Sequence, residues 1–144
     1  MIKRAIGSAG LALAVLLTAS GAVAAQSRTA VTMDVPTTFD EVPNLFVATG
    51  IAGCATGEVI DGGAHVEFTP APGVFAGSKV FACDGSDSGL VVRLNARFGP
   101  GGSVGSWAIV DAWGTLAGVR GSGSLTGDPI ANGIFDHYTG SIVR

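Results

Sequence analysis

The sequence predicts an all-β protein, and within that class an antiparallel eight-stranded barrel. Glycine supplies 23 of the 144 residues. Short segments with apolar residues at alternate positions are separated by clusters of Gly, Pro, Asp and Asn, which is typical of a meandering β protein. No segment after residue 25 has the apolar spacing and caps of a helix. Eight strands close into a barrel just wide enough for side chains or one small ligand. Strand count alone leaves a two-sheet β-sandwich as the alternative.

The first 25 residues are expected to be a secretory signal peptide. Lys3 and Arg4 supply the positive start, and residues 5–19 supply an apolar stretch. The small residues at 23–25 suit a signal peptidase, so cleavage is expected after Ala25. Residues 26–144 then form a single domain, large enough for one core. We therefore expect a secreted protein.

The charge balance excludes two classes of partner. The chain has 8 basic and 11 acidic residues, and removal of Lys3 and Arg4 with the signal leaves six basic residues. A net negative domain disfavours nucleic acid, which selects for clustered Lys and Arg. The same argument disfavours anionic lipid surfaces. The N-terminal apolar run is too short for a lasting membrane span, so the mature protein is expected to be soluble and free of membranes.

Two cysteines, Cys54 and Cys83, are present. Cysteines of an exported protein usually pair, so a disulfide between them is predicted. Such a bridge would close a loop of about 30 residues and stabilise the fold by about 3–4 kcal/mol. Neither cysteine lies in a C-x-x-C motif, and the second cysteine pair of a zinc site is missing. No metal site and no cofactor are predicted.

Residues 90–98 give the clearest strand. Their alternation places one face toward the core and the other, with Arg93 and Arg97, toward water. The inward set is Leu90, Val92, Leu94, Ala96 and Phe98. Residues 99–102 predict a turn, and the chain returns through 103–111 with Trp107 and Ile109 on one face. A hairpin is therefore predicted over 90–111.

The other strands are expected at 31–35, 45–51, 58–61, 64–69, 78–83, 121–126 and 134–143. Gly62 and Gly63 are interpreted as a two-residue hairpin turn between the third and fourth of these. In the segment that follows, Ala64, Val66 and Phe68 are expected to face the core. His65 and Glu67 then face solvent, which makes His65 an ordinary surface histidine.

A glycine-rich run carries a resemblance to a known family. Residues 114–123 read G-T-L-A-G-V-R-G-S-G, and the last strand contains I-F-D-H-Y-T-G at 134–140. Over residues 103–143 the chain resembles small secreted bacterial proteins with an allene oxide cyclase-like barrel, and it is similar to the glycine-rich segment of plant dirigent proteins. The family often has a further glycine where this chain has Leu116. The resemblance implies an eight-stranded barrel. In allene oxide cyclases the barrel cavity holds a fatty-acid epoxide. For this chain, the resemblance therefore implies, as an expectation, an apolar cavity that could hold a similar ligand.

The last predicted strand carries three adjacent ionisable side chains, Asp136, His137 and Tyr138. Alternation sends Asp136 and Tyr138 to one face and His137 to the other. Apolar neighbours lie on both faces, so the interior face stays open. An ionisable group that points inward is costly without a partner. It is expected either to pair with Arg93, Arg97 or Arg120, or to contact a ligand.

The remaining candidates have ordinary explanations beside their functional ones. Trp107, Trp113 and Tyr138 are candidates for lining a pocket, although aromatic residues of a small barrel are more often core. Residues 101–105 fit the hydrolase motif G-x-S-x-G. That motif needs a strand-to-helix turn at the serine, whereas Ser103 follows a Gly-Pro turn in a chain without helices, so a nucleophilic role is rejected.

Two functions remain open from the sequence. The favoured one is non-enzymatic binding of a small apolar ligand, or of an extracellular partner, by a secreted barrel. The candidate ligand-binding residues are Trp107, Trp113, Asp136, His137 and Tyr138. The alternative is an isomerase or cyclase that acts on an apolar, fatty-acid-like substrate inside the barrel, with Asp136, His137 or Tyr138 handling protons. The oligomeric state stays open.

Overall fold

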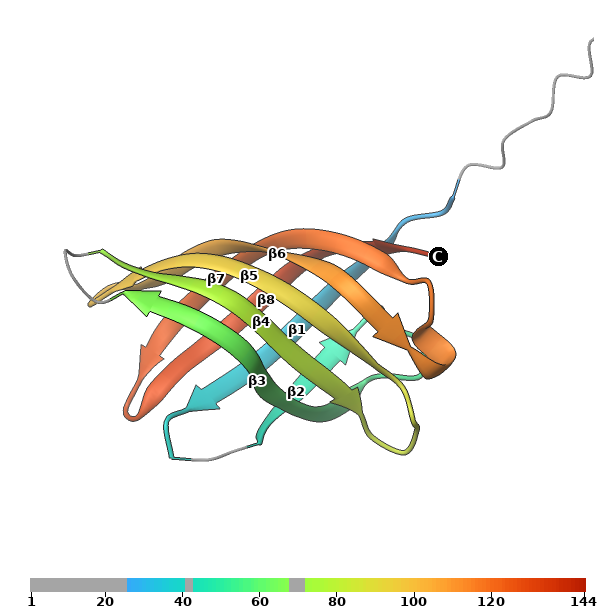
Figure 1. Ribbon diagram of the computed structural model, residues 1–144, viewed down its shortest axis with the longest axis horizontal. Helices are drawn as coiled ribbons and strands as arrows, with labels where there is room; N and C mark the ends of the chain where they lie inside the picture. Colours follow the sequence, from blue (N-terminus) through green and yellow to red (C-terminus); the bar gives the residue numbers. More distant parts are fainter. Residues whose placement is uncertain (1–25, 41–42, 68–71) are drawn as a thin grey trace, which may run out of the picture.

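The computed structural model describes residues 26–40, 43–67 and 72–144. Eight strands and one short 3-10 helix follow one another along the chain (Figure 1). They are β1 (Thr29–Thr38), β2 (Asn44–Thr49), β3 (Thr56–Glu67), β4 (Gly73–Cys83), β5 (Gly89–Gly99), β6 (Gly102–Trp113), η1 (Gly114–Leu116), β7 (Arg120–Ile130) and β8 (Gly133–Val143).

Every strand pairs antiparallel with its sequence neighbours, and β1 pairs with β8 to close the sheet. The closing seam is long, since its register runs from Thr29 opposite Ile142 to Thr38 opposite Gly133. A sheet closed on itself has no free outer strands, which distinguishes it from a sandwich of two sheets. The predicted eight-stranded barrel is therefore confirmed over the sandwich alternative.

Alternate residues of each strand fill the barrel. In β5, Leu90, Val92 and Leu94 are buried, while Arg93 and Arg97 are exposed, as predicted. The predicted hairpin of residues 90–111 is also confirmed, with Trp107 opposite Leu94. The largest side chains without solvent contact include Tyr138, Phe46, Phe81 and Met33. Aromatic rings thus occupy the middle of the barrel.

The predicted turn at Gly62 and Gly63 is wrong. β3 continues through both glycines, and its register against β4 shifts between Asp61 and Ala64, so the pair forms a bulge. A bulge accommodates extra residues while the strand keeps its direction. The hairpin turn comes later, between Glu67 and Gly73, and includes residues outside the described ranges. The expected inward position of Phe68 also lies outside them.

The ladder between β2 and β3 is short. Its last register pair is Asn44 opposite Val59, so β3 beyond that point is paired only with β4. This part of β3 extends past the barrel wall, and all its residues are exposed. Ala64 and Val66 lie on the inward face, as predicted, because they stand opposite Gly77 and Phe75, but they are exposed because the opposite wall does not reach them. His65 is exposed as expected and contacts Glu67 at 2.9 Å.

The two ends of the barrel differ, and we name them by their contents. The disulfide end carries Cys54, Cys83 and η1, at the right of Figure 1. The hairpin end carries the turns β5–β6 and β7–β8, together with the end of β1, the end of β3 and the start of β4, at the left of the figure. The predicted disulfide is confirmed, with Cα atoms 5.0 Å apart. Three buried apolar side chains join the two cysteines at this end: Ile51, Leu116 and Val119.

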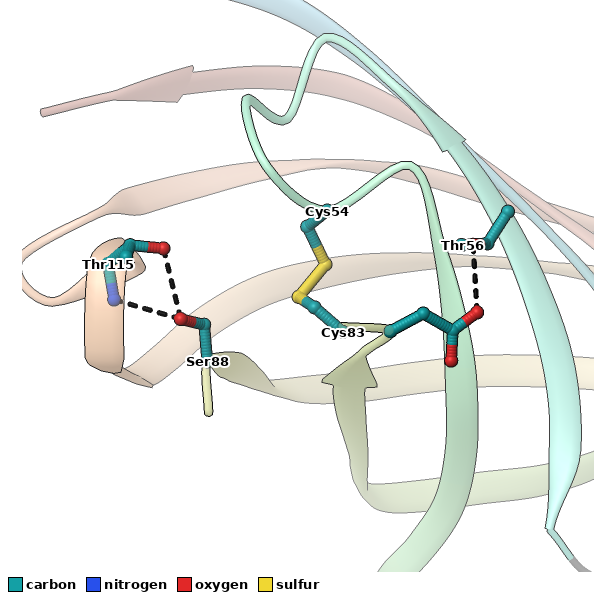
Figure 2. The surroundings of a disulfide bond; sticks show 6 residues. Cys54, Thr56, Cys83, Ser88 and Thr115 are labelled. Carbon is teal, nitrogen blue, oxygen red and sulfur yellow. Dashed lines mark hydrogen bonds between the residues drawn. A yellow bond between two sulfur atoms is a disulfide. The ribbon is translucent and has the colours of Figure 1, made fainter. Parts of the chain in front are cut away.

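Polar groups at the disulfide end are paired. The Ser88 hydroxyl accepts a hydrogen bond from the Thr115 backbone N–H at 2.9 Å and lies 3.0 Å from the Thr115 hydroxyl. Figure 2 shows both contacts. The Thr56 hydroxyl donates to Asp84 at 2.8 Å. Gly114 starts η1 with φ +63°, and a Cβ there would lie 2.1 Å from the Asp87 carbonyl oxygen. Glycine is required at this turn by both its backbone angle and the close approach.

The predicted signal peptide, residues 1–25, lies outside the described residues. Within residues 26–40, 43–67 and 72–144, no helix is long and apolar enough to cross a membrane.

Candidate functional site at the hairpin end

The structure decides which face of the last strand is interior. Asp136 and Tyr138 point into the barrel and are 5% and 0% exposed, whereas the His137 side chain faces outward and is 36% exposed. Tyr138 lies opposite Met33 of β1 and Leu125 of β7, both buried. Asp136 and Tyr138 therefore share the interior, and the outward His137 is separated from them by the sheet.

Asp136 pairs with a lysine, Lys79 of β4. The Lys79 Nζ atom lies 3.4 Å from Asp136 Oδ2, and both side chains are 8% exposed. Thr37 of β1 completes a triangle, since its hydroxyl donates to Asp136 Oδ2 at 3.0 Å and accepts from Lys79 Nζ at 3.1 Å. We call Thr37, Lys79, Asp136 and Tyr138 the polar cluster. The expected arginine partners are wrong.

Those three arginines are exposed. Arg93 and Arg97 lie on the outer face of β5, and Arg120 starts β7 at the disulfide end. Arg93 and Arg97 point to solvent because the inward positions of β5 are held by apolar residues.

Neighbouring strands leave room for the cluster. Asp136 lies opposite Gly127 of β7, where a Cβ would come within 2.9 Å of Asp136 Oδ1 and 2.3 Å of the Ser103 hydroxyl oxygen. A side chain at residue 127 would displace one of these groups. Lys79 lies opposite Asp61, which is exposed on the extending part of β3. The cluster thus sits where the closed barrel gives way to the β3–β4 extension.

Burial dominates the electrostatics of the cluster. It raises the pKa of Asp136 above the usual 3.8, and the Lys79 charge and the Thr37 hydrogen bond partly oppose the rise. Burial also raises the pKa of Tyr138 well above 10.0, with further contributions from the negative charges of Asp136 and Asp61. Tyr138 is therefore a neutral phenol and a hydrogen-bond donor at physiological pH.

The Tyr138 hydroxyl has no hydrogen-bond partner among the described residues, although it is buried. Aromatic neighbours fix the ring: its centroid lies 5.7 Å from that of Phe81 and 6.5 Å from that of Trp107, both in edge-on geometry. The Trp107 indole N–H differs, since it donates to the Thr139 carbonyl at 3.2 Å. A buried hydroxyl without a partner is uncommon and calls for an explanation.

The other predicted site residues are not brought into the cluster. Trp113 lies at the disulfide end, where its ring covers Gly89 at the start of β5. On the outer face, His137 contacts Asp34 at 2.8 Å and Asp128 at 3.5 Å, and its ring centroid lies 4.7 Å from that of Phe135. Trp107 is core that borders Tyr138. Two of the five candidates, Asp136 and Tyr138, thus belong to the cluster.

Ser103 is buried near the start of β6, within a strand. It is not at a strand-to-helix turn, so the geometry of a hydrolase nucleophile is missing here. The described residues contain no group of three or more His, Cys, Asp or Glu side chains that could hold a metal ion.

Lys79 and Thr37 are cluster residues that were not predicted from the sequence. Both follow the alternation of their own strands: Lys79 shares a face with Phe81 and Cys83, and Thr37 shares one with Val35. A predicted disulfide at Cys83 already placed that face of β4 inside. The alternation therefore contained the signal for an inward lysine.

Two surface hollows lie elsewhere. One, of about 360 Å³, covers the outer wall at β4 and β5, with Ser78, Arg93 and Asn95 among its lining residues. The other, of about 420 Å³, lies where β6 and β7 part near η1, with Asp111 and Arg120 in its lining. No residue of the polar cluster lines either hollow.

Comparisons with protein-family models, curated proteins and solved structures found no match to this chain. The function must therefore be argued from the barrel and its polar cluster.

Proposed function

We propose that this protein is a secreted binding barrel that accepts a small, mostly apolar ligand at its hairpin end and does not transform it. One observation carries the proposal: the buried Tyr138 hydroxyl, without a partner in the described residues, beside the ion pair of Lys79 and Asp136. A ligand that supplies the missing hydrogen bond accounts for a group that the folded chain alone leaves unsatisfied.

Stability does not explain the cluster. Replacing a buried ion pair by apolar side chains of similar volume is often neutral or stabilising. An unsatisfied buried hydroxyl costs about 1–3 kcal/mol. Apart from the buried Ser103, the barrel interior around the cluster is apolar and aromatic, and apolar residues would fill the same space at no such cost. Polar groups that cost stability in a core are typical of functional sites.

Apolar side chains lie between the cluster and the rim of the hairpin end. Phe75 of β4 faces inward opposite Val66 and Ala96, and it packs against the core. The Phe98 ring covers Gly73 at the start of β4. A ligand that reaches the cluster from this end would bury its hydrocarbon part against these rings. Binding sites of this kind combine an apolar lining with few convergent polar groups.

The extracellular location rests on two observations. A buried disulfide, here Cys54–Cys83, is typical of an oxidising compartment. The N-terminal segment has the composition of a signal peptide. Location is tested by expressing the full chain with a C-terminal tag. Recovery of a cytoplasmic product that keeps residues 1–25 would contradict secretion.

Binding is tested by incubating the purified protein with lipid extracts and recording native mass spectra. We expect one retained adduct, and we expect Tyr138→Phe to weaken its retention. Ser141→Ala, on the outer face of the same strand, is the matched control and should retain the adduct. The absence of any adduct from the extracts would contradict the proposed function.

A second candidate is an isomerase or cyclase that acts on an apolar substrate. The observation that favours it is the raised pKa of Asp136 near the Tyr138 phenol, because such pairs occur at catalytic sites. In that case the Asp136→Asn variant would bind the same small molecule as the original protein but would no longer convert it to a product. A retained molecule recovered with its structure unaltered, from both the original protein and this variant, would remove this candidate.

A further inference from the structure

We infer that Lys79 and Asp136 become joined by an amide bond, so that a covalent cross-link spans the interior of the barrel from β4 to β8. The inference goes beyond ligand binding and does not depend on it. The bond forms between the Lys79 Nζ atom and the Asp136 side-chain carbon Cγ, and one water molecule is released. The ion pair of the freshly folded chain is the reactant, and the amide is its slow product.

The fold holds the two reacting groups together. The Lys79 Nζ atom lies 3.4 Å from Asp136 Oδ2, an oxygen that is bonded directly to Cγ. Reacting atoms in a productive geometry are about 3–3.5 Å apart, and holding groups at such distances raises their effective concentration by orders of magnitude. The two residues are 57 positions apart in the chain, so this proximity exists only in the folded barrel.

Burial favours the reactive form of both groups. An amine attacks a carboxyl carbon only after it has lost its proton, and the carboxyl group must be uncharged to accept the attack. Both side chains are 8% exposed, and an apolar interior disfavours charged groups. Transfer of one proton from Lys79 Nζ to the Asp136 carboxylate removes both charges at once. Burial also raises the pKa of Asp136, which supports this transfer.

Thr37 is placed to move the second proton that the reaction requires. Its hydroxyl accepts a hydrogen bond from Lys79 Nζ at 3.1 Å and donates one to Asp136 Oδ2 at 3.0 Å. As the bond between Nζ and Cγ forms, Nζ gives a proton to the Thr37 oxygen, and the Thr37 hydroxyl proton passes to Oδ2. With the proton gained earlier, Oδ2 then leaves Cγ as water. Asp136 Oδ1 becomes the amide carbonyl oxygen, and no other reactant is consumed.

A second carboxylate near Lys79 lacks this arrangement. Asp61 lies opposite Lys79 in the register between β3 and β4, but it is exposed, and no ion pair joins these two side chains in the part of the chain that the structure describes. An exposed carboxylate keeps its hydration and its charge, and it resists attack by an amine. Asp136 is therefore the partner of Lys79.

The cross-link would brace opposite walls of the barrel. In the closed ring of eight strands, β4 and β8 are separated by four steps in either direction. A bond between them would act across the interior, whereas the hydrogen bonds of the sheet act along the wall. It would also replace two buried charges by one neutral amide, which is less costly to bury.

Intact mass spectrometry of the purified protein tests the inference. Protein kept unfolded in guanidinium holds the two side chains apart, and it is then refolded and incubated at neutral pH. After reduction of the disulfide, we expect the mass to fall by one water molecule per chain in the refolded sample and to stay unchanged in guanidinium. Protease digestion should then release two joined peptides, one with residue 79 and one with residue 136.

Lys79→Arg is the matched control, because a guanidinium keeps the positive charge but does not form this bond. Circular dichroism checks that the variant is folded, and its mass should stay unchanged. The variant retains the Asp-Gly sequences at 61–62 and 84–85, where ring closure of an aspartate also releases water. An equal loss of water in Lys79→Arg would therefore overturn the cross-link, as would an unchanged mass of the refolded original protein.

Two further variants test the chemistry. Asp136→Asn should form the same bond with ammonia in place of water as the leaving group, so its product should have the same mass as that of the original protein. Thr37→Val should slow the reaction roughly 100-fold, the effect of losing a positioned proton-transfer group. Reaction of Thr37→Val at the original rate would overturn the relay. Urea unfolding of freshly refolded protein measures the ion pair, and unfolding of aged protein measures the amide.

Discussion

The two ends of the barrel differ in how their buried polar groups are paired and in whether their strands are covalently linked. At the disulfide end, Cys54 and Cys83 are linked, Leu116 and Val119 are buried, and the Ser88 hydroxyl is bonded to Thr115. At the hairpin end, a lysine and an aspartate are buried together, and a tyrosine hydroxyl has no partner in the described residues. One end satisfies its polar groups and links its strands covalently. The other keeps groups that lower stability. The difference separates the part that holds the fold from the part that we propose to bind a ligand.

The largest expected effect comes from breaking the ion pair. Lys79→Met leaves the Asp136 carboxylate buried without its cation, so the free energy of unfolding should fall by about 3–5 kcal/mol at neutral pH. Urea unfolding measures it. The control is Lys79→Met combined with Asp136→Leu, which removes both charges and should return the stability to that of the original protein or above. A double variant as unstable as Lys79→Met would show that the pair stabilises the hairpin end.

Removing the disulfide should cost slightly less. Cys54→Ala with Cys83→Ala releases a loop with a sequence separation of 29 residues, and the chain-entropy estimate is about 3–4 kcal/mol. The loss should appear as earlier urea unfolding, and reduction of the original protein should reproduce it. Ligand binding at the hairpin end should survive in conditions where the variant is folded. Unchanged stability would mean that the disulfide end does not depend on its covalent link.

Tyr138→Phe is expected to stabilise the protein by about 1–2 kcal/mol. The change removes a buried hydroxyl that has no partner in the described residues and keeps the ring against Phe81 and Trp107. Thermal and urea unfolding measure the gain. Trp107→Phe is the contrasting variant, because its N–H is bonded to the Thr139 carbonyl, and it should destabilise. A loss of stability in Tyr138→Phe would indicate that the hydroxyl makes a bond that supports the fold.

The smallest expected effect is in the pH dependence. Because the pKa of Asp136 is raised in the folded protein, the folded state holds this proton more tightly than the unfolded state. The resulting stabilisation is present below the unfolded value of about 3.8 and is lost as pH rises through the higher folded value. Asp136→Asn cannot titrate, so its unfolding free energy should lose this downward component. Equal slopes for both proteins over this range would contradict the raised pKa.

Alternation was sufficient to predict much of the fold. In residues 92–98 apolar and polar side chains alternate, and the structure confirms both the strand and its hairpin. At Gly62 and Gly63 the same reasoning failed, because a glycine pair permits a bulge as well as a turn. Only the pairing with β4, a long-range contact, decides between them.

Only part of the site could be predicted from the sequence, because its remaining residues are identified by long-range contacts. Asp136 and Tyr138 were expected on one face, but Ile134 and Phe135 gave apolar neighbours to both faces of the strand. The ring contact between Tyr138 and Phe81 identifies the interior face, and it joins strands far apart in the sequence. Lys79 was not singled out because a lone lysine is normally exposed. Its burial depends on Asp136, which lies 57 residues away.

The seam between β1 and β8 has a consequence for when the chain can fold during its synthesis. Its register joins Thr29 to Ile142, so the first strand lacks one of its two neighbours until the last strand has been synthesised. Contacts between such distant parts of a chain form late and slowly. A chain leaving the ribosome therefore stays without its closed barrel during most of its synthesis. Under the proposed secretion, such an unfolded chain would suit a narrow translocation channel, and the cylinder would close once both strands have emerged on the far side.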